Sequence, residues 1–470
     1  MLFNSSTFLF FFIIVFIIYW SINNDFKKQN VLLLISSYVF YAWWDWRFLS
    51  LIIISSVIDY IVGLKISHSE TNKKKWLIVS LIANLGLLSF FKYFNFFTQS
   101  FSDMMQIFGW QPNDLTLNII LPVGISFYTF QTLSYTIDIY RKSFKPTNNL
   151  ISFFTYIAFF PQLVAGPIER ASNLLPQIER KRTFKKEWFN EGLIQILIGL
   201  FRKIVIADTL GAYVDTIYEN IGIYNSSSII LATFLYAFQI YYDFSGYSDI
   251  AIGTAKLLGF KFNPNFNLPY FSKSLTEFWR KWHMSLSYWL RDYLYISLGG
   301  NRKGIKITYR NLMLTMLLGG LWHGSSWNFV IWGGIHGFVL SVEKFLNSKK
   351  YISLPKKINF LGYLITFLVV LLSWVFFRSQ DLNSAFIAIN KIFNFDFSFP
   401  FIGDINIIMN SLIVLSIGII FDLYLFNKNL NLENFGKHFS IVKISIISTI
   451  IIILINLFYS TSNNFIYFQF

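Results

Sequence analysis

Residues 360–377 read FLGYLITFLVVLLSWVFF, an apolar stretch without a charged side chain. A helix of about 20 apolar residues is what crosses the roughly 30 Å hydrocarbon core of a bilayer. We therefore predict a transmembrane helix over this stretch. Because similar stretches recur along the chain, this kind of segment decides the fold.

The composition is that of a membrane protein. Of the 470 residues, 54% are hydrophobic and only 13% are charged, whereas a soluble domain has about 25% charged residues. Further apolar runs lie at about 7–22, 31–46, 49–66, 76–98, 119–140, 192–214, 228–250, 405–426 and 440–458. The sequence thus predicts an all-α polytopic integral membrane protein with about 10–11 transmembrane helices. We expect residues 1–470 to form one membrane domain that ends in an aromatic tail at 465–470.

The net charge of +15 would also suit a nucleic-acid binder, but its distribution argues against that class. With the N-terminus outside, most lysines and arginines fall in the inside loops 23–30, 65–75, 141–149, 166–190, 251–310, 344–357 and 427–443. This asymmetry follows the positive-inside rule. It predicts a multi-pass protein of the bacterial cytoplasmic (inner) membrane, surrounded by lipid, with both termini extracytoplasmic and no nucleic-acid partner.

Two further apolar segments, 150–165 and 311–343, have basic inside loops at both ends. Each is therefore expected to enter and leave from the cytoplasmic side as a re-entrant or hairpin segment, and together they would form a central funnel. Irregular backbone at membrane depth is tolerated only where protein or water satisfies it. The expected breaks lie at the glycines of the second segment, which are Gly319, Gly320, Gly324, Gly333, Gly334 and Gly337.

The second of these segments contains the strongest candidate for chemistry. Residues 318–327 read LGGLWHGSSW and place His323 among glycines and tryptophans. A polar group at membrane depth is costly, so it is a functional candidate by default. Imidazole, with an ordinary pKa of about 6.5, is a suitable general base near pH 7. The alternative is that His323 only hydrogen-bonds a carbonyl within a tight hairpin.

Residues 278–292, FWRKWHMSLSYWLRD, alternate aromatic and cationic side chains. One interpretation is an interfacial amphipathic helix on the inner leaflet. The other adds a binding site for a polyanionic, nucleotide-like acyl donor, formed by Arg280, Lys281 and Arg291. His283, in the middle of the stretch, is the second candidate for the chemistry, with a positioning role preferred to a direct catalytic one.

The remaining ionisable residues give smaller signals. Asp243 and Asp249 lie at the inner end of an apolar run, where carboxylates need partners, and Arg202 and Lys203 within another run could supply them. We prefer a structural ion-pair network to the alternative that these carboxylates bind the donor or line the reaction tunnel. His68, His336 and His438 are interpreted as structural or surface residues. The chain has no cysteine, which excludes disulfides and thiol nucleophiles, and no histidine pair has metal-ligand spacing, so we predict no metal.

Five ordered motifs resemble the membrane-bound O-acyltransferases, and within them the bacterial alginate O-acetylase group, which extends to peptidoglycan and other polysaccharide O-acetylases. The motifs are LPVGISF at 121–127, FPQLVAGPI at 160–168, YDFSGYSD at 242–249, FWRKWHMSL at 278–286 and LWHG at 321–324. The resemblance implies that His323 is the catalytic histidine and His283 the second candidate. It also implies a separate extracytoplasmic acetyltransferase partner of the serine-hydrolase type.

The last six residues, FIYFQF at 465–470, carry a second resemblance. Their Phe-x-Tyr-x-x-Phe pattern is similar to the C-terminal motif of the small partner peptide of the teichoic-acid D-alanyl transferase, in which the tyrosine is thought to carry the acyl group. This resemblance makes Tyr467 a third catalytic candidate. The alternative is that the aromatic tail anchors the chain at the membrane interface.

Together with these resemblances, the sequence predicts an O-acetyltransferase without a bound cofactor. Its expected donor substrate is acetyl-CoA on the cytoplasmic side, and its expected product is an O-acetylated cell-envelope or secreted polysaccharide. One alternative is a D-alanyl transferase for teichoic acid. An alternative of another class is a non-enzymatic transporter of polysaccharide or lipid precursors, which internal repeats would favour, but we find none in this sequence.

Overall fold

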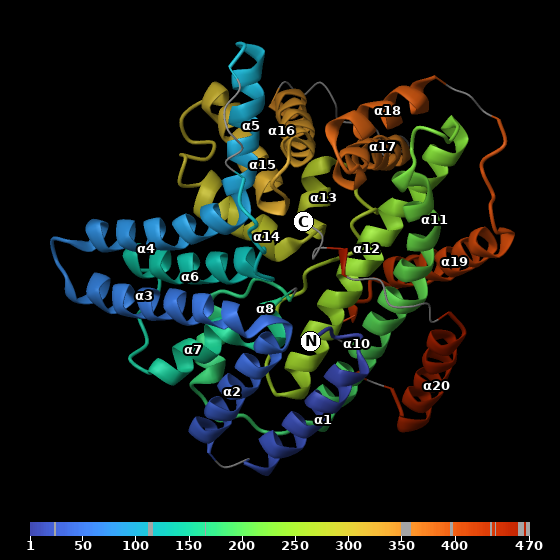
Figure 1. The fold of residues 1–470 in the computed structure, drawn as a ribbon. Coiled ribbons are helices and arrows are strands. Elements are labelled where there is room, and N and C mark those ends of the chain that lie inside the picture. Colours follow the sequence, from blue (N-terminus) through green and yellow to red (C-terminus); the bar gives the residue numbers. More distant parts are fainter. Residues whose placement is uncertain are drawn as a thin grey trace. The chain divides into compact units, whose positions relative to one another are not determined.

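The fold is described from a computed structural model of the chain. The description covers residues 1–470 with the exception of 23–24, 111–115, 165, 349–358, 395–397, 433–434, 438, 459–464 and 467–470. Across the described residues the regular structure is entirely helical (Figure 1), which confirms the predicted all-α class. Contacts divide the chain into two compact units, residues 1–186 with 254–263 and residues 187–253 with 264–470. The expectation of one membrane domain stays a prediction.

The first unit contains nine α-helices and two short distorted helical turns among its described residues. They are α1 (Ser6–Ser21), α2 (Phe26–Asp45), η1 (Trp46–Phe48), α3 (Leu49–His68), α4 (Lys73–Leu88), η2 (Ser89–Tyr93), α5 (Phe94–Ile107), α6 (Ile125–Tyr140), α7 (Leu150–Ala158), α8 (Phe160–Leu163) and α9 (Ala171–Ile178).

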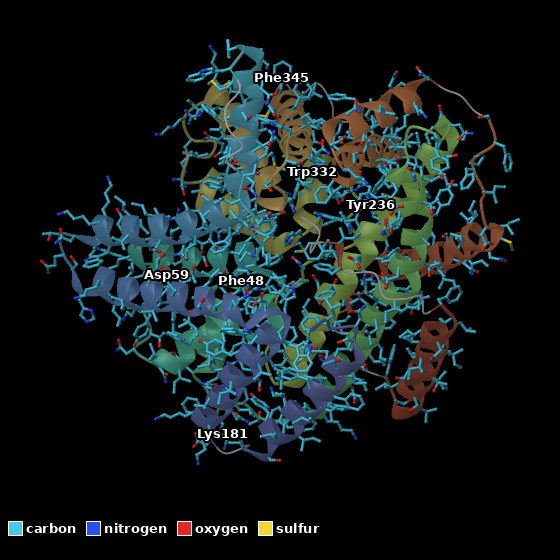
Figure 2. The ribbon with its side chains drawn as sticks, viewed as in Figure 1. Phe48, Asp59, Lys181, Tyr236, Trp332 and Phe345 are labelled. Atoms are coloured by element: carbon cyan, nitrogen blue, oxygen red, sulfur yellow. The ribbon has the colours of Figure 1, made fainter. Side chains whose placement is uncertain are left out.

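Helices α3, α4 and α6 pack along one another in this unit (Figure 1) and enclose polar side chains. Asp59 on α3, labelled in Figure 2, is fully buried and accepts hydrogen bonds from Ser80 Oγ at 2.5 Å and Asn84 Nδ2 at 2.7 Å, both on α4. Thr132 Oγ1 on α6 donates to the side-chain oxygen Oδ1 of Asn84 at 3.1 Å. A buried carboxylate is tolerated here because neighbouring helices supply its donors.

The second unit holds the longer helices of the C-terminal half. They are α10 (Lys186–Leu200), η3 (Phe201–Ala207), α11 (Asp208–Glu219), α12 (Ser226–Leu257), α13 (Leu275–Lys281), α14 (Met284–Trp289), η4 (Leu290–Tyr295), α15 (Ile305–His323), α16 (Trp327–Ser348), α17 (Asn359–Arg378), α18 (Leu382–Phe393), α19 (Ile405–Lys428) and α20 (Ile441–Phe458).

The chain is a polytopic integral membrane protein. Among its described residues, the segments long and apolar enough to cross a bilayer are Phe26–His68, Lys73–Ile107, Trp327–Asn347, Phe360–Arg378 and Ile405–Lys428. Four of them contain apolar runs that the sequence predicted, and the fifth is one arm of the predicted hairpin. The total of 10–11 transmembrane helices stays a prediction.

The segment 150–165 is broken, as expected for a chain that turns within the membrane. Helix α7 has 9 residues and α8 has 4, and Phe159 between them leaves helical geometry with φ −52° and ψ 107°. At 1.5 Å per residue neither helix can cross a bilayer. Entry from the cytoplasmic side and the central funnel remain predictions.

The segment 311–343 is a helical hairpin, but five of its six glycines are not breaks. Helices α15 and α16 pack against each other, and only Gly324 lies in the turn between them. Three of the others, Gly320, Gly333 and Gly337, allow close contact between the two helices. A Cβ at Gly320 would lie 2.1 Å from the Phe329 carbonyl oxygen, and one at Gly333 would lie 2.2 Å from that of Met316. Small residues bring helix backbones together in membranes. These glycines, which we interpreted as helix breaks, therefore form a packing seam, the line of close contact between α15 and α16.

The single amphipathic helix predicted over 278–292 is also wrong. Helix α13 ends at Lys281, Trp282 is extended with φ −98° and ψ 129°, and His283 is left-handed with φ 40° and ψ 56°. The chain then resumes as α14 and the π-helical η4. The side chains of Phe278, Trp282 and Trp289 are buried, so the aromatics that suggested an interfacial surface belong to the core.

Glycine contacts also join α10 to α12 within the second unit. A Cβ at Gly199 would lie 2.6 Å from the Gly246 carbonyl oxygen, and one at Gly253 would lie 2.6 Å from that of Gly192. The two glycines on each helix are seven residues apart, which is close to two helical turns and places them on one face. The close approach brings the polar face of α12 against the cations that follow α10.

We predict that Gly333→Ala destabilises the α15–α16 hairpin by about 1–3 kcal/mol, because overpacking a close contact forces the backbones apart. Gly334→Ala is the matched control, since the nearest atom to its Cβ is Leu317 Cδ2 at 3.7 Å. The measurement is the free energy of unfolding of each purified variant, from SDS titration in mild detergent. Equal values for the two variants would contradict the packing seam.

Candidate active site

His323 is the last residue of α15 and lies at the tip of the hairpin. Its side chain is 3% exposed and is surrounded by aromatic rings. Trp332 on α16, labelled in Figure 2, stands edge-on at 5.1 Å between ring centroids, and Phe377 on α17 stands edge-on at 5.5 Å. These neighbours fix the orientation of the imidazole and exclude bulk water from that side.

His283 lies in the second unit between α13 and α14, outside the five candidate spans. Its left-handed backbone is an uncommon conformation for a residue with a side chain. Such strain clusters at functional sites, where the surrounding structure holds it in place. The backbone N–H of Met284 donates to the Asn265 carbonyl oxygen at 2.8 Å, which ties the strained turn to the loop that precedes α13.

Asn265 also determines which ring nitrogen of His283 carries the proton. The Asn265 Nδ2 donates to Ser248 Oγ at 3.0 Å, and the Ser285 backbone N–H donates to Asn265 Oδ1 at 3.3 Å, so the orientation of the amide is defined. His283 Nδ1 lies 3.1 Å from Oδ1. Because a carbonyl oxygen only accepts, Nδ1 must donate, and Nε2 keeps its lone pair.

The two histidines that the sequence singled out are neighbours. Their ring centroids are 6.4 Å apart, and the Trp322 ring lies 5.9 Å from that of His283. Burial lowers the pKa of His283 to about 3 because desolvation disfavours the charged ring. At neutral pH the His283 imidazole is therefore uncharged, and both its tautomer and its orientation are fixed. The His323 imidazole lies beside it.

His336 has a structural role, as the sequence analysis expected. It is fully buried on α16 and accepts a hydrogen bond from Trp279 Nε1 at its Nδ1, over 3.2 Å. Its Nε2 lies 3.0 Å from Ser373 Oγ, which donates to the Val370 carbonyl oxygen. His336 Nε2 must therefore donate, and both ring nitrogens hold α13, α16 and α17 together.

A network of buried ion pairs lies on the α12 side of the second unit. Arg202 contacts Asp249 at 2.8 Å and Asp422 at 3.0 Å, and Lys203 contacts Asp208 at 2.7 Å and Asp243 at 2.6 Å. The predicted pairing of Arg202 and Lys203 with Asp243 and Asp249 is confirmed. Both cations are carried by η3, a π-helical turn, and π-helical turns are frequent at functional sites.

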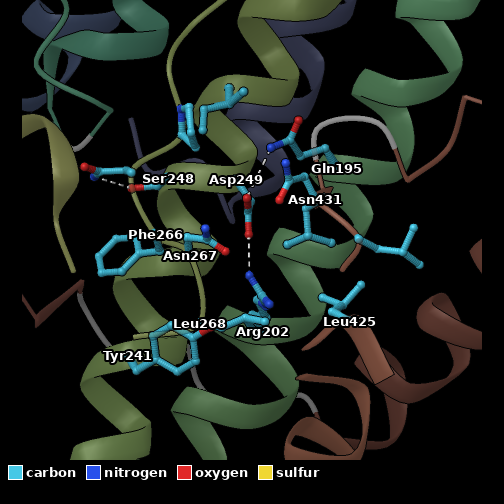
Figure 3. A pocket seen from close by; sticks show the side chains of 15 residues that line it. Gln195, Arg202, Tyr241, Ser248, Asp249, Phe266, Asn267, Leu268, Leu425 and Asn431 are labelled. Carbon is cyan, nitrogen blue, oxygen red and sulfur yellow. Dashed lines mark hydrogen bonds and ion pairs between the residues drawn. The ribbon is translucent and has the colours of Figure 1, made fainter. Parts of the chain in front are cut away.

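A pocket borders this network (Figure 3). Its polar lining includes Arg202, Asp249 and four amide side chains, which are Gln195, Asn265, Asn267 and Asn431. Gln195 donates to Asp249 at 3.2 Å. Asn265 faces both the pocket and His283, so one side chain separates the polar cavity from the buried imidazole.

The three cations predicted to bind the donor are placed differently from one another. Lys281 pairs with Glu277 at 2.7 Å and donates to the Phe271 carbonyl oxygen, while Arg291 pairs with Asp292 at 2.6 Å. Arg280 is exposed. Lys281 and Arg291 thus have carboxylate partners close in sequence, and their role in donor binding stays a prediction.

The C-terminal tail enters the second unit. Phe465 is 1% exposed and stacks on Tyr247 with centroids 4.4 Å apart, and the Ile466 backbone N–H donates to Asp243 Oδ2 at 2.9 Å. Tyr467, the catalytic candidate of the tail, lies outside the described residues.

Sequence reasoning missed the residues that hold the candidates in place. Asn265 and Asp422 are far from His283 and Arg202 in the chain, and nothing in their local sequence pairs them with those residues. The one available signal was the cost of a buried carboxylate: Asp422 interrupts the apolar run 405–426 and therefore required a cation.

The chain is similar to known acyltransferases. The model described as the membrane-bound O-acyltransferase family matches residues 26–386. The "Probable alginate O-acetylase AlgI" of Pseudomonas aeruginosa is 45% identical over 398 residues, 84% of this chain and 75% of the relative. The "Peptidoglycan O-acetyltransferase" of Helicobacter pylori is 39% identical over 75% of this chain and 71% of its own length. The "Teichoic acid D-alanyltransferase" of Bacillus subtilis is 30% identical over 58% and 72%.

We predict that Arg202→Met destabilises the protein by about 3–5 kcal/mol, because Asp249 and Asp422 are left buried without their cation. Arg47→Met is the control: its partner Asp45 lies 2.6 Å away, but Arg47 is exposed, so the loss should not exceed the scatter of the measurement. SDS titration of both purified variants measures the difference. A loss for Arg202→Met as small as that for Arg47→Met would show that the network does not stabilise the fold.

Proposed function

This chain belongs to the membrane-bound O-acyltransferase family, and from that premise we propose that it moves acetyl groups from cytoplasmic acetyl-CoA towards an extracytoplasmic polysaccharide. It is an acyltransferase, which sets aside the transporter alternative. The observation that supports the proposed site best is the juxtaposition of His323 and His283, whose ring centroids are 6.4 Å apart within an aromatic enclosure. The acceptor polymer belongs to the cell envelope or is secreted.

His323 acts as the general base in this proposal. It takes the proton of the acceptor hydroxyl while the hydroxyl oxygen attacks the thioester carbonyl carbon. The carbon–sulfur bond then breaks, the acyl group stays on the acceptor oxygen, and the thiolate leaves and takes up the proton. Neutral His283, fixed through Asn265, orients the reacting groups. The bound donor supplies the activated acyl group, and no bound cofactor is required.

Tyr467 is proposed as the first acceptor. A phenol with a pKa of about 10 is a better leaving group than a sugar hydroxyl, so an acyl-tyrosine keeps the acyl group activated. The buried positions of Phe465 and Ile466 support this idea, since they bring the tail to the unit that contains His283 and His323. A separate extracytoplasmic acetyltransferase of the serine-hydrolase type would complete transfer to the polymer.

The donor side of the proposal includes the pocket of Figure 3. Its amide side chains match the amide groups of a pantetheine-like arm, and Asn265 links it to His283. Of the three predicted cations, Arg280 is exposed and has no ion pair among the described residues, and we propose that it meets the nucleotide phosphates. We place the enzyme in the bacterial inner membrane with both termini extracytoplasmic, as the loop charges indicate.

The second candidate function is D-alanyl transfer to teichoic acid, which the similarity to the Bacillus subtilis relative supports. In that alternative an activated D-alanyl donor replaces acetyl-CoA, and His323 is again the general base. Incubation of the purified protein with labelled acetyl-CoA separates the two, because release of free CoA with acetylation of the chain requires acetyl transfer.

We predict that His323→Ala lowers CoA release by roughly 10²–10⁴-fold, the usual contribution of a general base. His68→Ala is the control, because His68 is exposed and its ring hydrogen-bonds the Leu64 carbonyl oxygen one helical turn earlier; its rate should match wild type. The measurement is CoA release by protein in detergent, with unfolding curves to confirm that both variants are folded. Wild-type rates in folded His323→Ala would refute the role of His323.

We also predict that Tyr467→Phe abolishes acetyl labelling of the C-terminal peptide, since the substitution keeps the ring and removes only the acceptor hydroxyl. Mass spectrometry of the digested chain after incubation with acetyl-CoA detects the acetyl group on wild type. Full acetylation of the polymer in cells that carry Tyr467→Phe would contradict the relay and favour direct transfer.

A further inference from the structure

We propose that Asp243 is a positioning residue that docks the C-terminal tail through the backbone N–H of Ile466. The inference deepens the proposed function, on which the role of Tyr467 rests, because Tyr467 follows Ile466 directly in the chain. In this proposal the YDFSGYSD motif at 242–249 does more than form ion pairs, because it also binds the C-terminal tail of the same chain.

The contacts of the tail carry this inference. Asp243 Oδ2 accepts the Ile466 N–H at 2.9 Å, in a buried position where both residues are less than 9% exposed. The Phe465 ring stacks on Tyr247 at 4.4 Å and stands edge-on to Phe244 at 5.7 Å. Three residues of one α12 turn, at positions 243, 244 and 247, thus receive two consecutive tail residues.

The charge distribution explains why a backbone N–H binds here. Lys203 holds the other carboxylate oxygen of Asp243 at 2.6 Å and is shared with Asp208. One ammonium group is thus shared by two carboxyl groups, and Asp243 Oδ2 faces the tail. A hydrogen bond from an N–H to a buried carboxylate is roughly twice as strong as one between neutral groups, so the cluster offers a strong acceptor at a defined place.

The dock is adjacent to the candidate active site. Phe244, which contacts Phe465, also stands edge-on to His283 with centroids 4.7 Å apart. A single aromatic ring therefore lies between the tail and one of the two imidazoles. A shift of the tail away from Asp243 would move the following residue relative to those imidazoles, which is how Asp243 would act on transfer without contacting substrate.

The other interpretation is that Phe465 and Ile466 only fill space in the core. Space filling depends on side chains, whereas docking on Asp243 depends on the main chain. The two can be separated at position 466 because proline has no backbone N–H. Ile466→Pro and Ile466→Ala both remove the isoleucine side chain, and only the proline variant also removes the donor.

The test uses both full-length variants in detergent. Hydrogen–deuterium exchange of the C-terminal peptide, residues 459–470, reports docking, and CoA release with acetyl labelling of Tyr467 reports function. With Ile466→Ala as the baseline, we expect Ile466→Pro to exchange faster over the tail and to lower kcat at least about 10-fold, while KM for acetyl-CoA is unchanged. A shift in kcat alone is expected of a positioning role.

A second variant, Asp243→Ala, removes the carboxylate that accepts the Ile466 hydrogen bond and leaves Lys203 paired with Asp208. It should also speed exchange of the tail while unfolding curves show a folded protein. Equal exchange in Ile466→Pro and Ile466→Ala would overturn the dock. Faster exchange with unchanged kcat would instead leave the dock in place and overturn the proposed relay through Tyr467, so the two failures are distinguishable.

Discussion

The second unit depends on the neutralisation of charges that lie among apolar helices. Arg202 on η3 contacts carboxylates of α12 and α19, and Lys203, the next residue, contacts α11 and α12. Removal of ions from water costs several kcal/mol each, so such charges persist only when their partners are held close. The ion pairs therefore fix four helical elements against one another, and the site is built on that frame.

Glycine contacts make this frame possible. In the contacts between α10 and α12 and between α15 and α16, glycines let the backbone of one helix approach the backbone of the other. The first seam leads into η3 and its two cations, and the second ends at His323. The two cations of η3 and the imidazole of His323 are thus each positioned by a pair of closely packed helices. Larger residues at the glycine positions would hold these helices further apart.

The sequence predicted the helical class, the hairpin, the pairing of Arg202 and Lys203 with Asp243 and Asp249, and the structural role of His336. The ion pairs could be predicted because a charged residue inside an apolar run is evident in the sequence and needs a partner of opposite charge. The sequence-based prediction failed over 278–292, where alternating aromatics and cations imitate an interfacial helix although the rings are buried. Periodicity cannot distinguish a lipid-facing ring from a core-facing one. It also missed Asn265, because only the folded backbone brings that amide to His283.

The position of His323 at the end of α15 has an electrostatic consequence for the chemistry. The carbonyl groups of the last helical turn carry the partial negative charge of the helix dipole. In the proposed mechanism the imidazole of His323 gains a positive charge as it takes the proton of the acceptor hydroxyl. The end of α15 would therefore stabilise the positive charge that the proposed general-base step creates, so the main chain of a 19-residue helix would support that step.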